Sequence, residues 1–188
     1  NASRVENPEV FAAARIGLGA LGVLTTLTFD IEPLGLLAAH EQAMSFDSAL
    51  SRYDEFIANN HHVDLYWFPH TDIAQVKTNN RLHADAGEPL SRLRSWFDDE
   101  FVANSLFGVV NAVGNRAPAM VPTLNRLAGK LLGERRYSDI PHRVFTSPRR
   151  VIFREMEYAV PSEAGLSALR EARAVIEAND WKISFPVE

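Results

Sequence analysis

Cysteine is absent from the 188 residues of this chain, which excludes disulfide bonds, thiolate metal sites and thiol nucleophiles. Positive charge is also scarce: 19 Lys and Arg against 24 Asp and Glu leave a formal net charge of −5, which argues against a nucleic-acid partner. No long hydrophobic run occurs either. The least polar stretch, residues 16–29, is shorter than the ~20 residues of a membrane helix and contains three glycines. We therefore expect no transmembrane segment and a soluble, cytoplasmic protein, with peripheral membrane association left open.

What is present is an ordinary globular composition, with 46% hydrophobic and 23% charged residues. A chain of this length buries roughly 70% of the surface that it exposes when unfolded, so it needs no covalent staple. The first residues, NAS, lack an initiator methionine, and the last, WKISFPVE, stop within a strand-like alternation. We therefore expect an excised piece of a longer protein.

Helical and strand patterns are mixed along the chain without a strict strand–helix–strand rhythm, which favours an α+β fold. Apolar spacings of three and four predict helices through Phe46–Ile57, Leu90–Phe101, Leu124–Leu131 and, after a Ser162 cap, Leu166–Ile176. A glycine turn at Gly19–Gly22 is expected to lead into a strand. The predicted strands are residues 23–31, 63–68, 73–78, 143–145, 151–160 and 182–187.

The last predicted strand assigns a direction to Glu188. Side chains alternate between the two faces of a strand, so Ile183, Phe185 and Val187 share one face. That apolar set belongs in the core. Glu188 is therefore predicted to point away from the core, towards solvent or towards a site.

Three constellations have both an ordinary and a functional interpretation. His61, His70 and Asp72 contain metal-ligand types, but the adjacent His61 and His62 point to opposite faces of a strand, so a metal site is disfavoured. The aromatic run Tyr66–Phe68 is typical of a core strand rather than of a stacking platform. Six arginines between Gly133 and Glu155 are interpreted as a solvated, ion-paired face more readily than as an anion site; they are Arg135, Arg136, Arg143, Arg149, Arg150 and Arg154.

A fourth constellation is the G-x-G-x-x-G spacing of Gly17, Gly19 and Gly22. A dinucleotide-binding unit requires a helix after these glycines, whereas a strand is predicted here, so that fold is rejected. A turn in which the backbone closely approaches a cofactor remains an open interpretation.

Several segments, in order along the chain, resemble one family, the FAD-linked sugar-lactone and alditol oxidases of the vanillyl-alcohol oxidase superfamily. They are ARIGLGALGVLTTLTFDIEP (14–33), VDLYWFPHTDIAQVKTNN (63–80), PHRVF (141–145), FREMEYAVP (153–161) and SFPVE (184–188). The family includes D-arabinono-1,4-lactone oxidase, L-gulonolactone oxidase, L-galactonolactone dehydrogenase and alditol oxidase.

The resemblance implies that residues 1–35 are the tail of an FAD-binding domain and that residues 36–188 are a truncated substrate-binding cap. The cap would have a mixed, largely antiparallel sheet flanked by helices. The resemblance implies that FAD lies against the backbone of Gly19, Gly22 and Val23. It also implies that Glu188, in the FPxExR motif, hydrogen-bonds a substrate hydroxyl. No metal site is expected.

The implied reaction is oxidation of a sugar lactone or polyol by hydride transfer to flavin, with oxygen, a cytochrome or a quinone as the electron acceptor. These 188 residues alone are expected to be inactive and to hold FAD weakly. Two alternatives stay open: a free-standing α+β module that binds a polyol or an anion without a cofactor, and a metal-dependent hydrolase using His61, His70 and Asp72.

Overall fold

A computed structural model describes residues 1–82, 107–146 and 150–188 of the chain, which divide into two compact units, Asn1–Pro33 and Leu34–Glu188. The first unit contains one helix, α1 (Pro8–Arg15), which begins with proline and carries Glu9 in its first turn. The predicted glycine turn follows this helix. The strand predicted at residues 23–31 is wrong: the segment pairs with no strand in the described ranges, and its apolar side chains, Val23 and Ile31 among them, are exposed.

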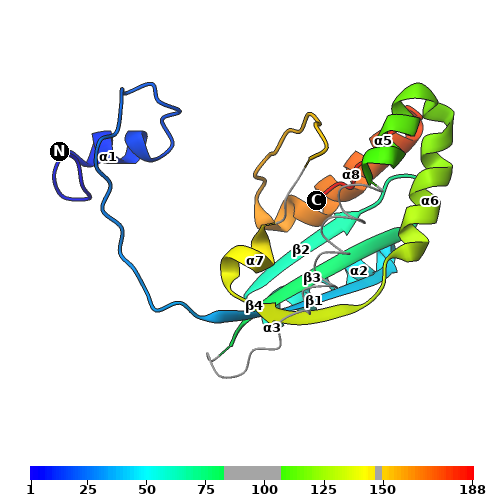
Figure 1. Cartoon of the computed structure of the whole chain (residues 1–188), viewed down its shortest axis with the longest axis horizontal. Coiled ribbons are helices and arrows are strands. Elements are labelled where there is room, and N and C mark those ends of the chain that lie inside the picture. Colours follow the sequence, from blue (N-terminus) through cyan, green and yellow to red (C-terminus); the bar gives the residue numbers. More distant parts are fainter. Residues whose placement is uncertain (83–106, 147–149) are drawn as a thin grey trace. The chain divides into compact units, whose positions relative to one another are not determined.

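The second unit is built on a sheet of four strands in the order β2-β3-β1-β4 (Figure 1). The strands are β1 (Leu36–Ser45), β2 (His62–Trp67), β3 (Ile73–Leu82) and β4 (Arg135–Asp139). All their pairings are antiparallel, and β1 pairs with β3 over ten residues, from Leu36 opposite Leu82 to Ser45 opposite Ile73. The predicted α+β class with a largely antiparallel sheet is confirmed, as are β2 and β3. Neither β1 nor β4 is predicted from the sequence.

The main core lies on one face of this sheet, under helices α2 (Phe46–Ser51), α3 (Tyr53–Asn59) and α8 (Gly165–Ala178). Ser45 caps α2 by accepting a hydrogen bond from the Ser48 amide (3.2 Å). Both predicted helices are confirmed, the first interrupted at Arg52. The 3₁₀ turn Ser162–Ala164 precedes α8. The buried core comprises Phe46, Ala49, Leu50, Phe56, Leu65, Trp67, Ala74, Val76 and Ile176.

The other face of the sheet carries a smaller cluster, in which Leu37 and Ala39 contact Val144 of helix α7 (Pro141–Phe145). The strand predicted at residues 143–145 is wrong, because Pro141 begins a helix at its first position. Residues 151–160, also predicted as a strand, form no strand in the described part of the chain.

Two further helices, α5 (Phe107–Arg116) and α6 (Val121–Leu131), flank the 3₁₀ turn Pro118–Met120. The prediction of a helix at α6 is confirmed, but its predicted apolar stripe is wrong. The residues that α6 buries are Val121, Asn125 and Gly129, whereas Leu127 and Leu131 are exposed. The stripe predicted at Leu90–Phe101 lies outside the described residues. Among the helices in the described ranges, none has the length and apolarity that a bilayer span demands.

Candidate functional site

The segment that carries Glu188 lies beside strand β2. Trp67 and Val187 exchange two backbone hydrogen bonds, each with an N···O distance of 2.8 Å. This single bridge is all the pairing that forms where the sequence predicts a strand over residues 182–187, so that strand prediction is wrong.

The alternation predicted along this segment holds for Ile183 and Val187, which both pack against the main core. Phe185 instead contacts the ring of Phe153, with 4.4 Å between ring centroids. Glu188 is exposed. Because Val187 faces the core, the neighbouring Glu188 side chain is directed away from it. The role of Glu188 in binding or catalysis stays a prediction.

Asn125 of helix α6 connects this segment to the turn between β2 and β3. Its Nδ2 donates to the carbonyl oxygens of Pro69 and Ile183, at 2.9 Å each, and the residue is 3% exposed. Both amide hydrogens are thereby used, and two loops distant in sequence are held by one side chain. From α5, Asn111 accepts a hydrogen bond from the Ser184 hydroxyl.

Sequence reasoning does not find Asn125 or Asn111, since polar residues on helices are usually solvent-exposed. The available signal for Asn125 is its spacing of four residues from both Val121 and Gly129, small or apolar positions of the same helix face.

The second predicted set of site residues lies in the first unit. Gly19 and Gly22 adopt positive φ angles of 80° and 106°, and a Cβ atom added to either would meet nothing within 4 Å. The turn is closed by hydrogen bonds from the Ala20 amide to Gly17 (2.8 Å) and from the Gly22 amide to Gly19 (3.1 Å). Val23 is 90% exposed. The predicted glycine turn is confirmed, and the residues that follow it form neither a helix nor a strand in the described part of the chain.

The candidate metal ligands are not brought together. His61 precedes strand β2, whereas His70 and Asp72 follow it, so the strand separates them. Across residues 1–82, 107–146 and 150–188, no group of three or more His, Cys, Asp or Glu side chains is arranged to hold a metal ion.

The arginine-rich segment is largely ion-paired. Arg136 bonds Glu134 at 2.7 Å, Arg143 lies 3.5 Å from Asp139, and Arg135 bonds the buried Glu41 at 2.9 Å. The pairs of Arg136 and Arg143 support the solvated, ion-paired interpretation, whereas Arg135 is ion-paired at a largely buried position. Arg149 lies outside the described residues. Trp67 is fully buried, which confirms a core role for the centre of the aromatic run.

Comparison with known proteins matches residues 27–188 to the sequence profile of a family described as D-arabinono-1,4-lactone oxidase. L-gulono-1,4-lactone dehydrogenase of Mycobacterium tuberculosis is 34% identical over 95% of this chain and 41% of its own length. L-gulonolactone oxidase of Bos taurus is 29% identical over 99% of this chain and 42% of its own length. D-arabinono-1,4-lactone oxidase of Debaryomyces hansenii is 24% identical over 73% of this chain. The chain thus spans about two-fifths of the length of the first two relatives.

Proposed function

Because the chain belongs to the D-arabinono-1,4-lactone oxidase family, we propose that it is part of an FAD-dependent oxidoreductase that oxidises a sugar lactone or an alditol. The observation that carries this proposal is the match over residues 27–188, which includes the FPxE residues Phe185, Pro186 and Glu188. The named relatives are aldonolactone oxidases and dehydrogenases, so lactones are the first substrates to test.

We assign residues 1–35 to the end of an FAD-binding domain and residues 36–188 to a substrate-binding cap. The division of the chain after Pro33 supports a boundary near this position. Because each part is then only a portion of a functional domain, the 188 residues by themselves should bind FAD weakly and be inactive.

The open turn in the first unit fits a cofactor that approaches the backbone. Gly19 and Gly22 hold left-handed conformations that other residues adopt only at a cost, and no side chain stands over them. We assign Gly19, Gly22 and Val23 to FAD contact. When bound, FAD supplies the hydride acceptor for oxidation of a carbinol carbon.

Glu188 is assigned to the substrate. Its carboxylate would accept a hydrogen bond from the hydroxyl on the carbon to be oxidised and so fix the direction in which the C–H bond points. The support is positional: Val187 is held by Trp67 and the core, and Ile183 by Asn125, so the backbone before Glu188 is fixed at two points.

The first test is the visible absorption spectrum of the full-length protein before and after anaerobic addition of gulono-, galactono- and arabinonolactone and of xylitol. A flavin spectrum that bleaches with one of these compounds supports the proposal and identifies the substrate class. A colourless protein contradicts it and favours a cofactor-free binding module.

Glu188→Gln tests the assigned residue. Loss of a charged hydrogen bond to substrate should lower turnover roughly ten- to a thousandfold, with flavin content unchanged. Glu163→Gln, an exposed glutamate before α8, is the matched control and should turn over like the wild type. Wild-type turnover in Glu188→Gln would remove Glu188 from the site.

A further inference from the structure

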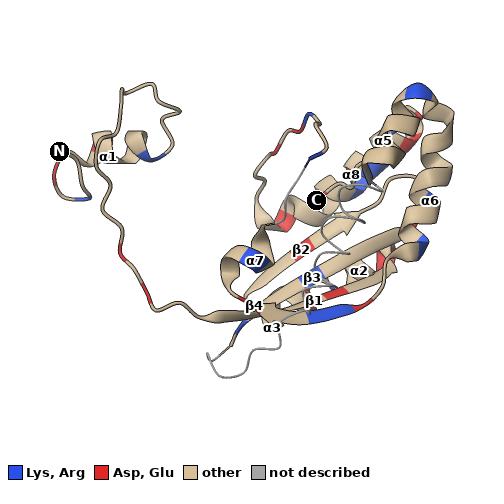
Figure 2. Ribbon diagram, viewed as in Figure 1, with Lys and Arg blue, Asp and Glu red and all other residues tan. Residues whose placement is uncertain are grey.

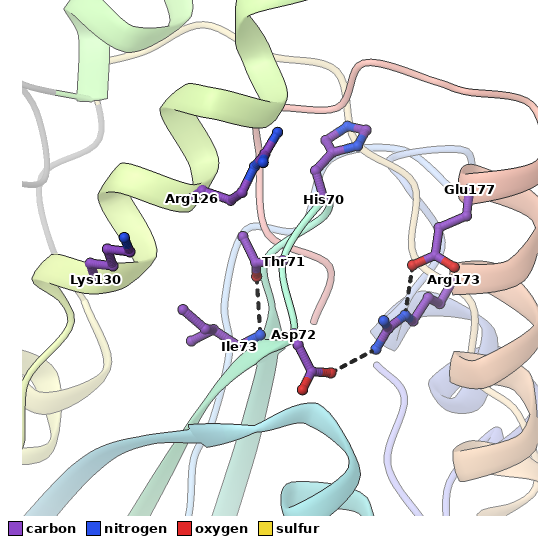
Figure 3. Close-up of a pocket in the computed structure, with 8 residues that line it drawn as sticks. All are labelled: His70, Thr71, Asp72, Ile73, Arg126, Lys130, Arg173 and Glu177. Atoms are coloured by element: carbon purple, nitrogen blue, oxygen red, sulfur yellow. Dashed lines mark hydrogen bonds and ion pairs between the residues drawn. The ribbon is translucent and has the colours of Figure 1, made fainter.

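A cavity of about 400 Å³ surrounds the turn between β2 and β3, with helix α6 on one side and helix α8 on the other (Figure 3). This volume is in the range of small-molecule sites. The turn contributes His70–Ile73, and the helices contribute four charged side chains. Neither Glu188 nor the glycine turn lines it.

On the α8 side, one arginine is paired with two carboxylates. Arg173 bonds Glu177 at 2.8 Å and Asp72 at 3.4 Å, and its guanidinium lies over the Phe46 and Trp67 rings at 4.7 and 5.5 Å from their centroids. Arg173 is therefore fixed as a structural cation. One oxygen of Asp72 is used by this pair, and its side chain remains 63% exposed, so a second acceptor oxygen faces solvent.

On the α6 side, the charges are not neutralised. Figure 3 shows Arg126 and Lys130 on successive turns of α6, beside the turn. Arg126 donates through Nε to the Pro122 carbonyl of its own helix at 3.0 Å. Within the described ranges, neither Arg126 nor Lys130 has a carboxylate partner. Two like charges four residues apart repel each other, and a bound anion would relieve that repulsion.

His70 also lines the cavity. Burial lowers the pKa of its imidazole, and the charge of Lys182 lowers it further, which favours the uncharged form of the ring. Its Nε2 atom is buried and has no hydrogen-bond partner among the residues that the structure describes. The backbone of His70 has a positive φ of 66°, a conformation uncommon for residues other than glycine.

We propose that this cavity binds a small polyhydroxy carboxylate, with the carboxylate on Arg126 and Lys130 and a hydroxyl group on the free oxygen of Asp72. The cavity is polarised, since α6 contributes two cations with no carboxylate partner in the described ranges, while the α8 side has one arginine between two carboxylates. A ligand with an anionic end and hydroxyl donors matches both sides at once. The proposed contacts use neither Glu188 nor any residue of the glycine turn.

The probe is gluconate, titrated into the full-length protein by isothermal calorimetry at constant ionic strength. A ligand of this size should bind with a dissociation constant in roughly the millimolar range. Glucitol, which lacks the charge, and acetate, which lacks the hydroxyls, should each bind at least ~10-fold more weakly. Inorganic phosphate or acetate binding as tightly as gluconate would overturn the assignment to a hydroxylated ligand.

Variants locate the site. Both cations are exposed, so Arg126→Gln/Lys130→Gln should fold normally and weaken gluconate binding roughly 10- to 100-fold. The matched control is Arg170→Gln, an exposed arginine of α8 that does not line the cavity, and it should bind like the wild type. Glu188→Gln should also retain binding. Gluconate binding that survives the double substitution, or that is lost only in Glu188→Gln, would overturn the proposal while leaving the proposed oxidoreductase function standing.

Discussion

Replacing Asn125 with leucine removes two hydrogen bonds and leaves two carbonyl groups, of Pro69 and Ile183, without their donor in a site that is 3% exposed. A buried polar group that loses its partner costs about 1–3 kcal/mol. Two such groups, partly offset by the apolar leucine side chain, should lower the free energy of unfolding by about 2–4 kcal/mol. Leucine keeps the branched shape of asparagine but is larger, so some overpacking adds to the cost of the lost hydrogen bonds.

The assay is urea unfolding of the full-length protein followed by circular dichroism, and the expected change is a midpoint lowered by about 1–2 M. Asn59→Leu is the matched control, because Asn59 is exposed on α3 and donates a single bond to the Glu55 carbonyl of its own helix. A midpoint for Asn125→Leu equal to that of the control would refute the argument that Asn125 holds the turn and the Glu188 segment together.

Two further perturbations test the same region. Burial and the Lys182 charge lower the pKa of His70, so the unfolded chain takes up this proton first, near pH 6.5, and stability is lost as the pH falls below that value towards the folded pKa. Between pH 7.5 and 5.5, the urea midpoint should therefore fall further in the wild type than in His70→Asn. Asparagine is chosen because it tolerates the left-handed backbone at this position. Equal falls in both proteins would contradict this prediction. In Gly129→Val, the Cβ would lie 2.8 Å from Ile73 Cδ1. This overpacking should lower the free energy of unfolding by about 1–3 kcal/mol, as measured by urea denaturation. Gly133→Val, where a Cβ meets nothing within 4 Å, is its control, and an equal cost in both would argue against a steric cause.

The candidate site is predicted only in part by the sequence. Alternation alone assigns Val187 to the core and Glu188 to the other face, and the structure places Val187 accordingly. The glycine turn is also recognised, because glycine can adopt a positive φ without the steric cost that a Cβ atom imposes. The cavity is not recognised. Arg126 and Arg173 are 47 residues apart and lie on different helices, and only the packing of both helices around the β2–β3 turn brings them to one place.

The sequence by itself determines the elements whose local pattern and tertiary surroundings agree: α8, the α2–α3 segment and the β2–β3 hairpin. The tertiary structure decides the rest. Strand β1 contains LLAAHEQA, a helix-favouring composition, and becomes a strand because β3 and β4 pair with it on both sides. Residues 23–31 and 151–160 have the strand pattern and form no strand in the described part of the chain. The physical reason is that helix hydrogen bonds close within a segment, whereas a strand exists only where a partner strand meets it.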